Sequence, residues 1–285
     1  MVLSFVIPTH NRAHLVSFAI NSILKQRIDN YEIIVVNDGS RDNTDKVLAS
    51  FEDKIQVIRN EKAAGVSASR NLGVDRARGK WIAFLDDDDY YIEDTLPEVF
   101  SVLADGSIDF FWVGCEDVHT DTDNRTLRWC EEISPKELST ATFVHRIGAG
   151  FLFVKRTAFL AVRGFDSELS LSEDRDLVLR LLKNGAKYTS HPKPVLCRRM
   201  HSDSKSRTSS REEQLLADLA VLKKNRHFLN TKPHLEVRLL DDIASNYLLM
   251  GRKPAALAFA KKSLQRMPVR IKGVRRLVEI LLSRD

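Results

Sequence analysis

Short apolar runs alternate with longer amphipathic segments along the first 85 residues. Four of these runs predict strands: 3–7, 32–36, 55–59 and 81–85. The first two are typical of buried strands, which are apolar and rich in Ile and Val. The segments between the four runs predict three helices: 13–25, 42–51 and 65–76. Strands that alternate with helices of this length indicate βαβ units and a parallel sheet covered on both faces, which is an α/β fold.

The pattern becomes weaker beyond residue 100. Three further elements are predicted before residue 190: strands at 108–114 and 148–154, and a helix at 172–183 with Ser172 as its N-cap. Residues 116–140 are polar and predict a loop or a short hairpin, and the Ser- and Arg-rich segment 201–211 predicts a mobile stretch.

The rest of the chain predicts helices only: 212–228, 234–250, 254–266 and 269–283. We therefore place a boundary near residue 210. An α/β domain occupies residues 1–210, with halves 1–105 and 106–210, and an all-helical region occupies residues 211–285.

Composition narrows the class of protein. The chain has 285 residues, of which 43% are hydrophobic and 29% charged, as in ordinary globular proteins. No apolar stretch approaches the length of a membrane-spanning helix, and the start of the chain lacks the basic leader of a secretory signal. The three cysteines, Cys115, Cys130 and Cys197, are too scattered for a disulfide framework. We expect a cytoplasmic protein.

The charge is unevenly distributed. Residues 198–285 hold 20 Lys and Arg against nine Asp and Glu, a balance of +11, whereas residues 1–197 have a balance of −6. The basic region predicts an anionic partner, or is simply a solvated basic face. Its last segment, 269–283, predicts a basic amphipathic helix, which either lies on the inner face of an anionic membrane or packs on its helical neighbours.

Four consecutive aspartates, Asp86 to Asp89, follow the predicted strand 81–85. Ligands of α/β sheets bind at the carboxyl ends of strands, and a divalent cation would offset the mutual repulsion of these carboxylates. In an extended segment Asp86 and Asp88 would point the same way and Asp87 the opposite way. The alternative is an acidic cap on the following helix.

Asp38 ends the second predicted strand and begins the turn Asp38-Gly39-Ser40. Its side chain either forms an Asx-turn or accepts hydrogen bonds from a base or ribose at the sheet edge. The spacing alone does not decide between these roles.

Five blocks in this order resemble family 2 glycosyltransferases, which have the GT-A fold, a Rossmann-like mixed sheet with helices on both faces. They are Val6 to Arg12, Ile33 to Ser40, Gly65 to Gly73, Phe84 to Asp89, and Gly164-Phe165-Asp166 followed by Glu173-Asp174. The resemblance covers about residues 2–185, and leaves the helical region out. It implies a nucleotide-binding half at 1–105 and an acceptor half at 106–210.

The resemblance implies roles for individual residues on the donor side. The residues that would hold the nucleotide, or order its site, are Pro8, Thr9, Arg12, Asp38, Arg70, Asp86 and Asp87. Asp88 would bind Mn²⁺ or Mg²⁺ on the diphosphate, and His201 falls where relatives place a late histidine near the metal.

On the acceptor side the resemblance implies that Asp174 is the general base and that Glu173 lies beside it. Trp112 is expected in the core or in the wall of the site, where it could flank the acceptor. Adjacent helical side chains lie about 100° apart, so only one member of the Glu173–Asp174 pair faces the donor easily. Charges in the first turn are also favoured by the helix dipole, a role compatible with catalysis.

The implied reaction is direct displacement on a nucleotide-sugar, expected to be a UDP-sugar. One base takes the proton of the acceptor hydroxyl, and the anomeric centre is inverted. We expect a glycan or lipid-linked saccharide as the acceptor, and a role in bacterial surface polysaccharide synthesis.

Two other classes of protein compete with this interpretation. A sugar-phosphate nucleotidyltransferase has a related fold but requires a glycine-rich loop after its first strand. This chain has Pro8 to Arg12 at that place, without a glycine. A nucleic-acid-binding protein would use the basic region but leaves the aspartates without a role. We therefore expect no nucleic-acid partner.

Overall fold

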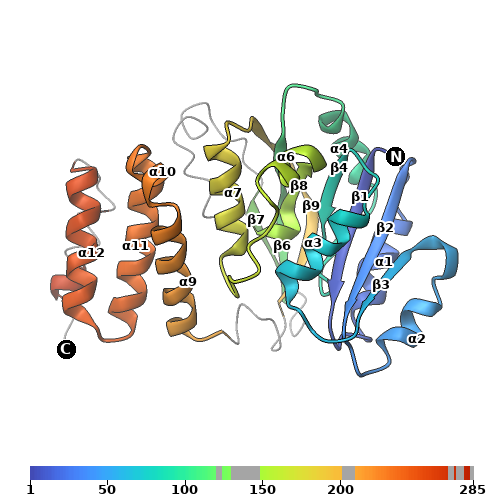
Figure 1. The fold of residues 1–285 in the computed structure, drawn as a ribbon, viewed down its shortest axis with the longest axis horizontal. Helices are drawn as coiled ribbons and strands as arrows, with labels where there is room; N and C mark the ends of the chain where they lie inside the picture. The colour runs from blue at the N-terminus through green and yellow to red at the C-terminus, as the bar shows by residue number, and fades with distance from the viewer. Residues whose placement is uncertain (120–123, 130–147, 201–208, 269–272, 274–278, 283–285) are drawn as a thin grey trace.

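A computed structural model describes residues 1–119, 124–129, 148–200, 209–268, 273 and 279–282. Within them, nine strands form one sheet in the order β3-β2-β1-β4-β8-β6-β9-β5, with β7 paired to β6. Figure 1 shows the sheet at one end of the molecule and the C-terminal helices at the other, with α7 between them.

The first half of the sheet follows the predicted βαβ pattern. Its elements are β1 (Leu3–Thr9), α1 (Val16–Leu24), β2 (Tyr31–Asp38), α2 (Thr44–Ala49), the 3-10 turn η1 (Glu52–Lys54), β3 (Gln56–Asn60), α3 (Val66–Arg76) and β4 (Trp81–Phe84). Strand β1 is parallel to both β2 and β4, and β2 is parallel to β3. All four predicted strands and all three predicted helices are present, and the helices begin one to three residues later than predicted.

The second half of the sheet is less regular. Its elements are β5 (Tyr90–Tyr91), α4 (Leu96–Leu103), β6 (Phe110–His119), β7 (Asn124–Trp129), η3 (Ala149–Phe151), β8 (Leu152–Lys155), α6 (Arg156–Ala161), α7 (Glu173–Lys183) and β9 (Tyr188–Met200). Strand β8 is antiparallel to β4 and β6, whereas β9 is parallel to β6. The sheet is therefore mixed, as the family resemblance implies, and the parallel sheet predicted from the first 85 residues is confirmed for β1 to β4.

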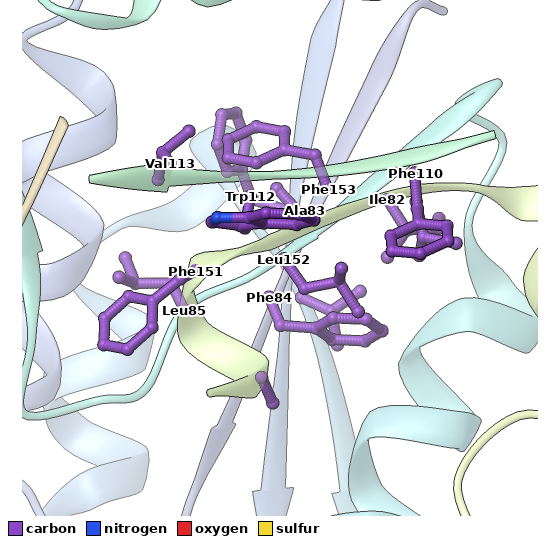
Figure 2. Packing of buried hydrophobic residues seen from close by; sticks show 14 of the residues in the cluster. Ile82, Ala83, Phe84, Leu85, Phe110, Trp112, Val113, Phe151, Leu152 and Phe153 are labelled. Carbon is purple, nitrogen blue, oxygen red and sulfur yellow. The ribbon is translucent and has the colours of Figure 1, made fainter. Parts of the chain in front are cut away.

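Aromatic side chains fill the core between the sheet and its helices (Figure 2). Phe111 stacks on Phe153 with ring centroids 4.9 Å apart, and Trp81 meets Phe111 edge-on. Trp112 belongs to this core, because it is 6% exposed and its ring lies 6.2 Å from that of Tyr188.

Four helices follow the sheet: α9 (Arg211–Lys224), α10 (Arg226–Asn230), α11 (Pro233–Leu249) and α12 (Lys253–Arg266). The predicted helix 212–228 is divided at Asn225, whose side chain donates to the Asp176 carboxylate at 2.9 Å. Ser210 and Glu213 form a capping box at the start of α9. Most of the predicted helix 269–283 lies outside the described residues.

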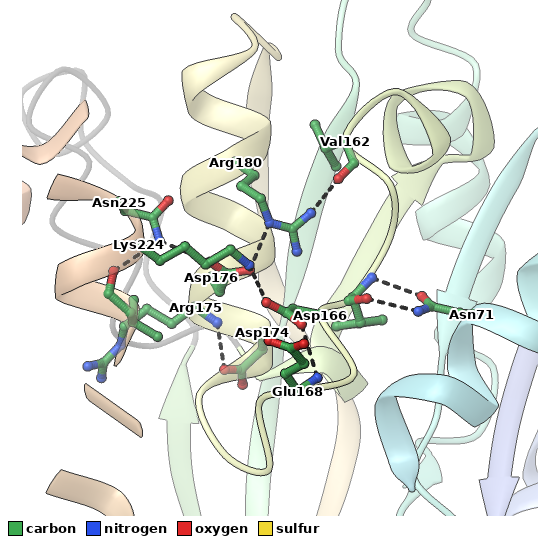
Figure 3. Close-up of polar contacts among 12 residues, drawn as sticks. Asn71, Val162, Asp166, Glu168, Asp174, Arg175, Asp176, Arg180, Lys224 and Asn225 are labelled. Carbon is green, nitrogen blue, oxygen red and sulfur yellow. Dashed lines mark hydrogen bonds and ion pairs between the residues drawn. The ribbon is translucent and has the colours of Figure 1, made fainter. Parts of the chain in front are cut away.

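The helical region contacts the sheet domain through α7 (Figure 3). Asp176 is fully buried and receives Arg180 Nε at 2.7 Å, Lys224 Nζ at 2.8 Å and Asn225 Nδ2. Lys224 also contacts Asp166 at 2.6 Å. One buried carboxylate of the sheet domain thus binds the end of α9.

In the part of the chain described here, no helix combines the length and the apolar character needed to cross a membrane.

Candidate active site

A cavity of about 1240 Å³ opens at the carboxyl ends of β1, β2 and β4 and continues along α7 to the C-terminal helices. Ten of the predicted site residues line it: Pro8, Thr9, Arg12, Asp38, Arg70, Asp86, Asp87, Asp88, Glu173 and Asp174. It exceeds the roughly 300–1,000 Å³ typical of small-molecule sites. The cavity therefore has room for more than one small ligand.

Asp38 is bound by the chain that follows β3. Its Oδ1 accepts from Asn60 Nδ2 at 2.7 Å and from the Ala64 amide at 2.9 Å, and its Oδ2 accepts from the Gly65 amide at 2.8 Å. Burial alone would raise the pKa of Asp38, but these hydrogen bonds outweigh it and lower the pKa. The ionised carboxylate thus fixes the loop before α3 at the rim of the cavity.

The four aspartates form a turn rather than an extended segment, since the Asp89 amide donates to the Asp86 carbonyl at 3.1 Å. Their side chains therefore diverge. Asp86 binds Arg70, Asp87 accepts from Thr9 Oγ1 at 2.6 Å, and Asp88 Oδ2 lies 3.5 Å from an Arg12 nitrogen. The expected alternation of Asp86 and Asp88 against Asp87 is wrong, because the turn replaces it.

Crowding and burial disturb the ionisation of this cluster. Burial raises the pKa of Asp87 to about 7, although the Thr9 hydrogen bond opposes the change. Burial, together with the charges of Asp88 and Asp86, also raises the pKa of Asp89. A positive charge at this turn would relieve the repulsion.

Arg199, at the end of β9, holds the same turn from the other side. Its amide donates to Asp89 Oδ1 at 3.0 Å and its Nε donates to the Asp88 carbonyl at 2.7 Å. Its guanidinium also lies over the Phe18 ring. Arg199 was not among the predicted site residues because its strand was not predicted. The signal for it is the apolar run Val195 to Cys197, which precedes two arginines.

Arg70, on α3, joins the two sides of the cavity. It is 4% exposed, and it donates to Asp86 Oδ1 at 2.7 Å and to Glu173 Oε1 at 2.8 Å. Burial would lower the pKa of Arg70, but the two carboxylates raise it overall. The guanidinium also lies over the ring of Phe165. Because Glu173 is engaged by Arg70, it is less available than its neighbour for proton transfer.

Asp174 lies in the first turn of α7 and faces the cavity. Its Oδ1 accepts from the Arg175 amide at 2.6 Å. Burial and the charge of Glu173 raise the pKa of Asp174 to about 7, against the opposing influence of Arg175 and Arg70. A carboxyl with this pKa is suited to accept a proton near neutral pH.

Ser172 does not cap α7 as predicted. It has a left-handed backbone, with φ of 58°, and its side chain makes no capping bond. Its Oγ instead donates to Asp218 at 3.1 Å and accepts from Gln214 at 2.9 Å, both on α9. The neighbouring Arg175 also contacts Asp218, at 3.0 Å. The start of α7 is therefore held by the helical region.

A bound cation would need ligands beyond the side chains that the structure describes. Among the described residues, no group of three or more His, Cys, Asp and Glu side chains is placed to hold a metal. Oxygen ligands suit Mg²⁺ and Mn²⁺, and the crowded carboxylates fit a cation that is also held by phosphate oxygens. The other predicted metal ligand, His201, lies outside the described residues.

Trp112 does not line the cavity. Its burial beside Phe110 and Tyr188 confirms the first of its two expected places, the core, and the wall of the site is formed by other residues. The cavity instead gains polar residues that sequence analysis did not single out, including Gln214, Asp242 and Asn246 of the helical region.

The sequence profile of glycosyl transferase family 2 matches residues 4–160, more than half of the chain. The chain therefore belongs to this family. The mixed sheet with flanking helices is a GT-A fold, and TarS from S. aureus shares it. The crystal structure of TarS 1-349 in complex with UDP-GlcNAc matches with a TM-score of 0.73 and 17% identity, over 98% of this chain and 89% of that one.

Two relatives extend the comparison. An uncharacterized glycosyltransferase from Haemophilus influenzae is 32% identical over 188 residues, which are 64% of this chain and 62% of the relative. The Escherichia coli UDP-Glc:alpha-D-GlcNAc-diphosphoundecaprenol beta-1,3-glucosyltransferase WfgD is 30% identical over 184 residues, which are 64% of this chain and 70% of the relative. Both matches leave about a third of each protein uncovered.

Proposed function

We propose that this chain is an inverting, metal-dependent glycosyltransferase that moves a sugar from a UDP-sugar to a hydroxyl of a glycan or lipid-linked saccharide. One observation carries the proposal: Asp174, with a pKa of about 7, lines the same cavity as the turn Asp86 to Asp89. Arg70 joins the two sides through Asp86 and Glu173. The site thus offers a proton acceptor and an anionic turn suited to a cation and a diphosphate.

The donor is assigned to the end of the cavity at β1, β2 and β4. Asp38 and the loop that it fixes would meet the base, and Thr9 and Arg12 would line the phosphate path. Asp87 would approach the ribose and Asp88 would hold Mn²⁺ or Mg²⁺. A divalent cation at this point would offset the charge that develops on the leaving diphosphate. The bound UDP-GlcNAc of the TarS structure supports a uridine nucleotide.

The acceptor hydroxyl gives its proton to Asp174. Glu173 does not compete for this role, since its carboxylate is engaged by Arg70 at 2.8 Å. With a single base, the acceptor oxygen attacks the face of the sugar opposite the leaving group, and the anomeric centre is inverted. Family membership favours this transfer over the nucleotidyltransferase alternative.

The acceptor class is proposed from a relative. The name of the E. coli glucosyltransferase specifies a sugar on diphosphoundecaprenol, a diphosphate with a long hydrocarbon chain. A lipid-linked acceptor of this kind would place the enzyme at the cytoplasmic face of a membrane, in the synthesis of surface polysaccharide. The basic region 198–285 would favour that location.

Nucleotide binding is the first test. UDP with Mn²⁺ should raise the melting temperature of the protein by several degrees, and UDP without metal should raise it less, because a ligand that binds only the folded state stabilises it. Asp38→Asn should weaken the effect of UDP, as the loop 61–65 would lose a charged anchor. A screen of UDP-sugars for nucleotide release would then identify the donor. No response to any nucleoside diphosphate would contradict the proposal.

Membrane contact is tested separately with the full-length chain. Replacing Arg270, Lys272, Arg275 and Arg276 by Gln should reduce flotation with phosphatidylglycerol liposomes, while phosphatidylcholine liposomes should bind neither protein. Equal flotation of the two proteins would exclude this segment as the membrane contact.

A further inference from the structure

The cavity extends beyond the family-matched part of the chain. Two C-terminal helices line its far end: α9 through Gln214 and Asp218, and α11 through Asp242, Ser245 and Asn246. These positions are spaced i, i+4 on α9 and i, i+3, i+4 on α11, so each set shares one face of its helix. The profile match ends at residue 160, and both helices lie outside it.

The face of α11 at the cavity is polar, although the helix is otherwise well buried. Leu239, Leu240 and Ile243 are each at most 1% exposed and form its apolar side. A helix that only docks on a neighbouring domain is expected to present an apolar stripe to it. Here the stripe that meets the cavity consists of a carboxylate, a hydroxyl and an amide, which are groups that can hydrogen-bond a polar ligand.

This polar face is continuous with the proposed base. Arg175 directly follows Asp174 and contacts Asp218 at 3.0 Å and Asp242 at 3.4 Å. The stripe is therefore placed beside the site of proton transfer, at the opposite end of the cavity from Asp38. The nucleotide-sugar is assigned to other residues, at the donor end of the cavity. A ligand that lies along α11 would therefore be a second molecule.

We infer that α9 and α11 form the acceptor subsite and take a saccharide through Gln214, Ser245 and Asn246. This inference rests on the proposed function. The acceptor oxygen forms a bond to the anomeric carbon, the bond from that carbon to the diphosphate breaks with its electron pair, and the hydroxyl proton passes to Asp174. Asn246 is well suited to a sugar hydroxyl, because its hydrogen bond to Asp218 is long, at 3.5 Å.

The test compares the full-length wild-type enzyme with one double variant and one single variant. Ser245→Ala/Asn246→Ala removes polar groups from the subsite. Gln265→Ala removes an amide from the exposed surface of α12 and serves as the matched control. With Mn²⁺ and the UDP-sugar that the screen identifies, two rates are measured: transfer to p-nitrophenyl β-D-glucoside or p-nitrophenyl N-acetyl-β-D-glucosaminide, and donor hydrolysis by water.

We expect the double variant to raise the KM for the glycoside about tenfold and to lower the ratio of transfer to hydrolysis by the same factor, which corresponds to about 1.4 kcal/mol. Gln265→Ala should behave as the wild type does. Equal ratios for wild type and double variant would overturn the inference. Absence of donor hydrolysis and of UDP binding in the wild type would instead contradict the proposed function.

A binding measurement covers the case in which the glycosides are poor substrates. Saturation-transfer difference NMR on protein saturated with UDP and Mn²⁺ should show both glycosides bound to the wild type and to Gln265→Ala, with signals several-fold weaker for the double variant. Failure of the wild type to bind either glycoside, or equal signals in all three proteins, would also overturn the inference.

Discussion

The two ends of the cavity are built in different ways. At the donor end, the key carboxylates are held by short contacts between neighbouring strand ends and their turns. Asp38 binds Asn60 and the amides of Ala64 and Gly65, and Thr9 of β1 binds Asp87 just after the adjacent β4. Parallel pairing of these strands brings the partners together.

At the acceptor end, the contacts join segments that are separate in the fold. Asp174 lies at the start of α7, and the residues around it are held by Asp218 of α9 and Asp242 of α11. Asp176 is bound by Lys224 and Asn225 at the end of α9. The geometry of the proposed base therefore depends on correct docking of the helical region.

This difference suggests that donor binding can vary independently of acceptor binding and proton transfer. The donor end is encoded by contiguous blocks, so changes there alter nucleotide binding directly. The acceptor end depends on charged side chains that cross between α7 and the helices, so changes in the helices can alter the acceptor or the base while the donor end is preserved. The following variants test that separation.

The largest effect is expected for Asp174→Asn, which keeps the size of the side chain and removes its basicity. Sugar transfer should fall about 10³-fold, within the range for loss of a general base, while UDP binding should stay close to that of the wild type. Initial rates at saturating donor and titration calorimetry with UDP and Mn²⁺ measure the two quantities. Turnover within a few-fold of the wild type would assign the base elsewhere.

The next largest effect is expected on stability, for Asp176→Ala. This carboxylate is fully buried and binds Arg180, Lys224 and Asn225, so its loss leaves two cations without their shared partner. Both cations are partly exposed to water, which reduces the cost to about 2 kcal/mol, or about 5 °C in melting temperature.

Asp166→Ala is the matched control for Asp176→Ala, because it removes a more exposed carboxylate from the same Lys224. Its cost should stay within about 1 kcal/mol, as for other surface ion pairs. Urea unfolding of both variants measures the difference. Equal stability of the two variants would show that the buried contact does not hold the helices on α7.

The sequence predicts the donor end well, for a physical reason. Strands β1, β2 and β4 are buried along most of their length, so their apolar runs are unambiguous, and the polar residues that follow the strands must meet at one edge of the sheet. Ten of the predicted site residues indeed line one cavity. Even there, the hydrogen bond that turns Asp89 back on Asp86 depends on local geometry that the residue order does not reveal.

The acceptor end was predicted less well, because its elements gain their structure from distant partners. Strand β9 contains two prolines and several charges, yet it pairs with β6 and β5 and brings Arg199 to the aspartate turn. Ser172 looks like a helix cap, but its side chain binds α9. The polar face of α11 can be recognised as part of the cavity only once the position of the helix against α7 is known.

The pH dependence of transfer tests the electrostatics at the acceptor end. Asp174 acts as a base only when deprotonated, and burial raises its pKa to about 7. The rate should therefore be highest above pH 8 and half-maximal near pH 7, and should fall about tenfold per pH unit below pH 6. Rates at saturating donor between pH 5.5 and 9 measure this fall at low pH, which is the acid limb of the profile. A flat profile down to pH 5.5 would mean that the reacting base has an ordinary carboxyl pKa.

The smallest effect is expected for Asp218→Asn, which tests whether a C-terminal helix tunes the base. Asparagine can keep the hydrogen bonds from Ser172, Arg175 and Gln214 to Oδ1, but it removes the negative charge that faces Arg175. The charge of Arg175 would then act more strongly on Asp174 and lower its pKa, as it already does in part.

The acid limb of Asp218→Asn should therefore move to lower pH by a few tenths of a unit, and the rate on the plateau should fall by less than about twofold because a less basic carboxylate accepts the proton less readily. A purely structural role for Asp218 would lower the melting temperature and leave the limb in place. Lys223→Gln, on the exposed surface of the same helix, should leave both the limb and the plateau as in the wild type. A shift confined to Asp218→Asn would show that the helical region sets the ionisation of the base as well as its position.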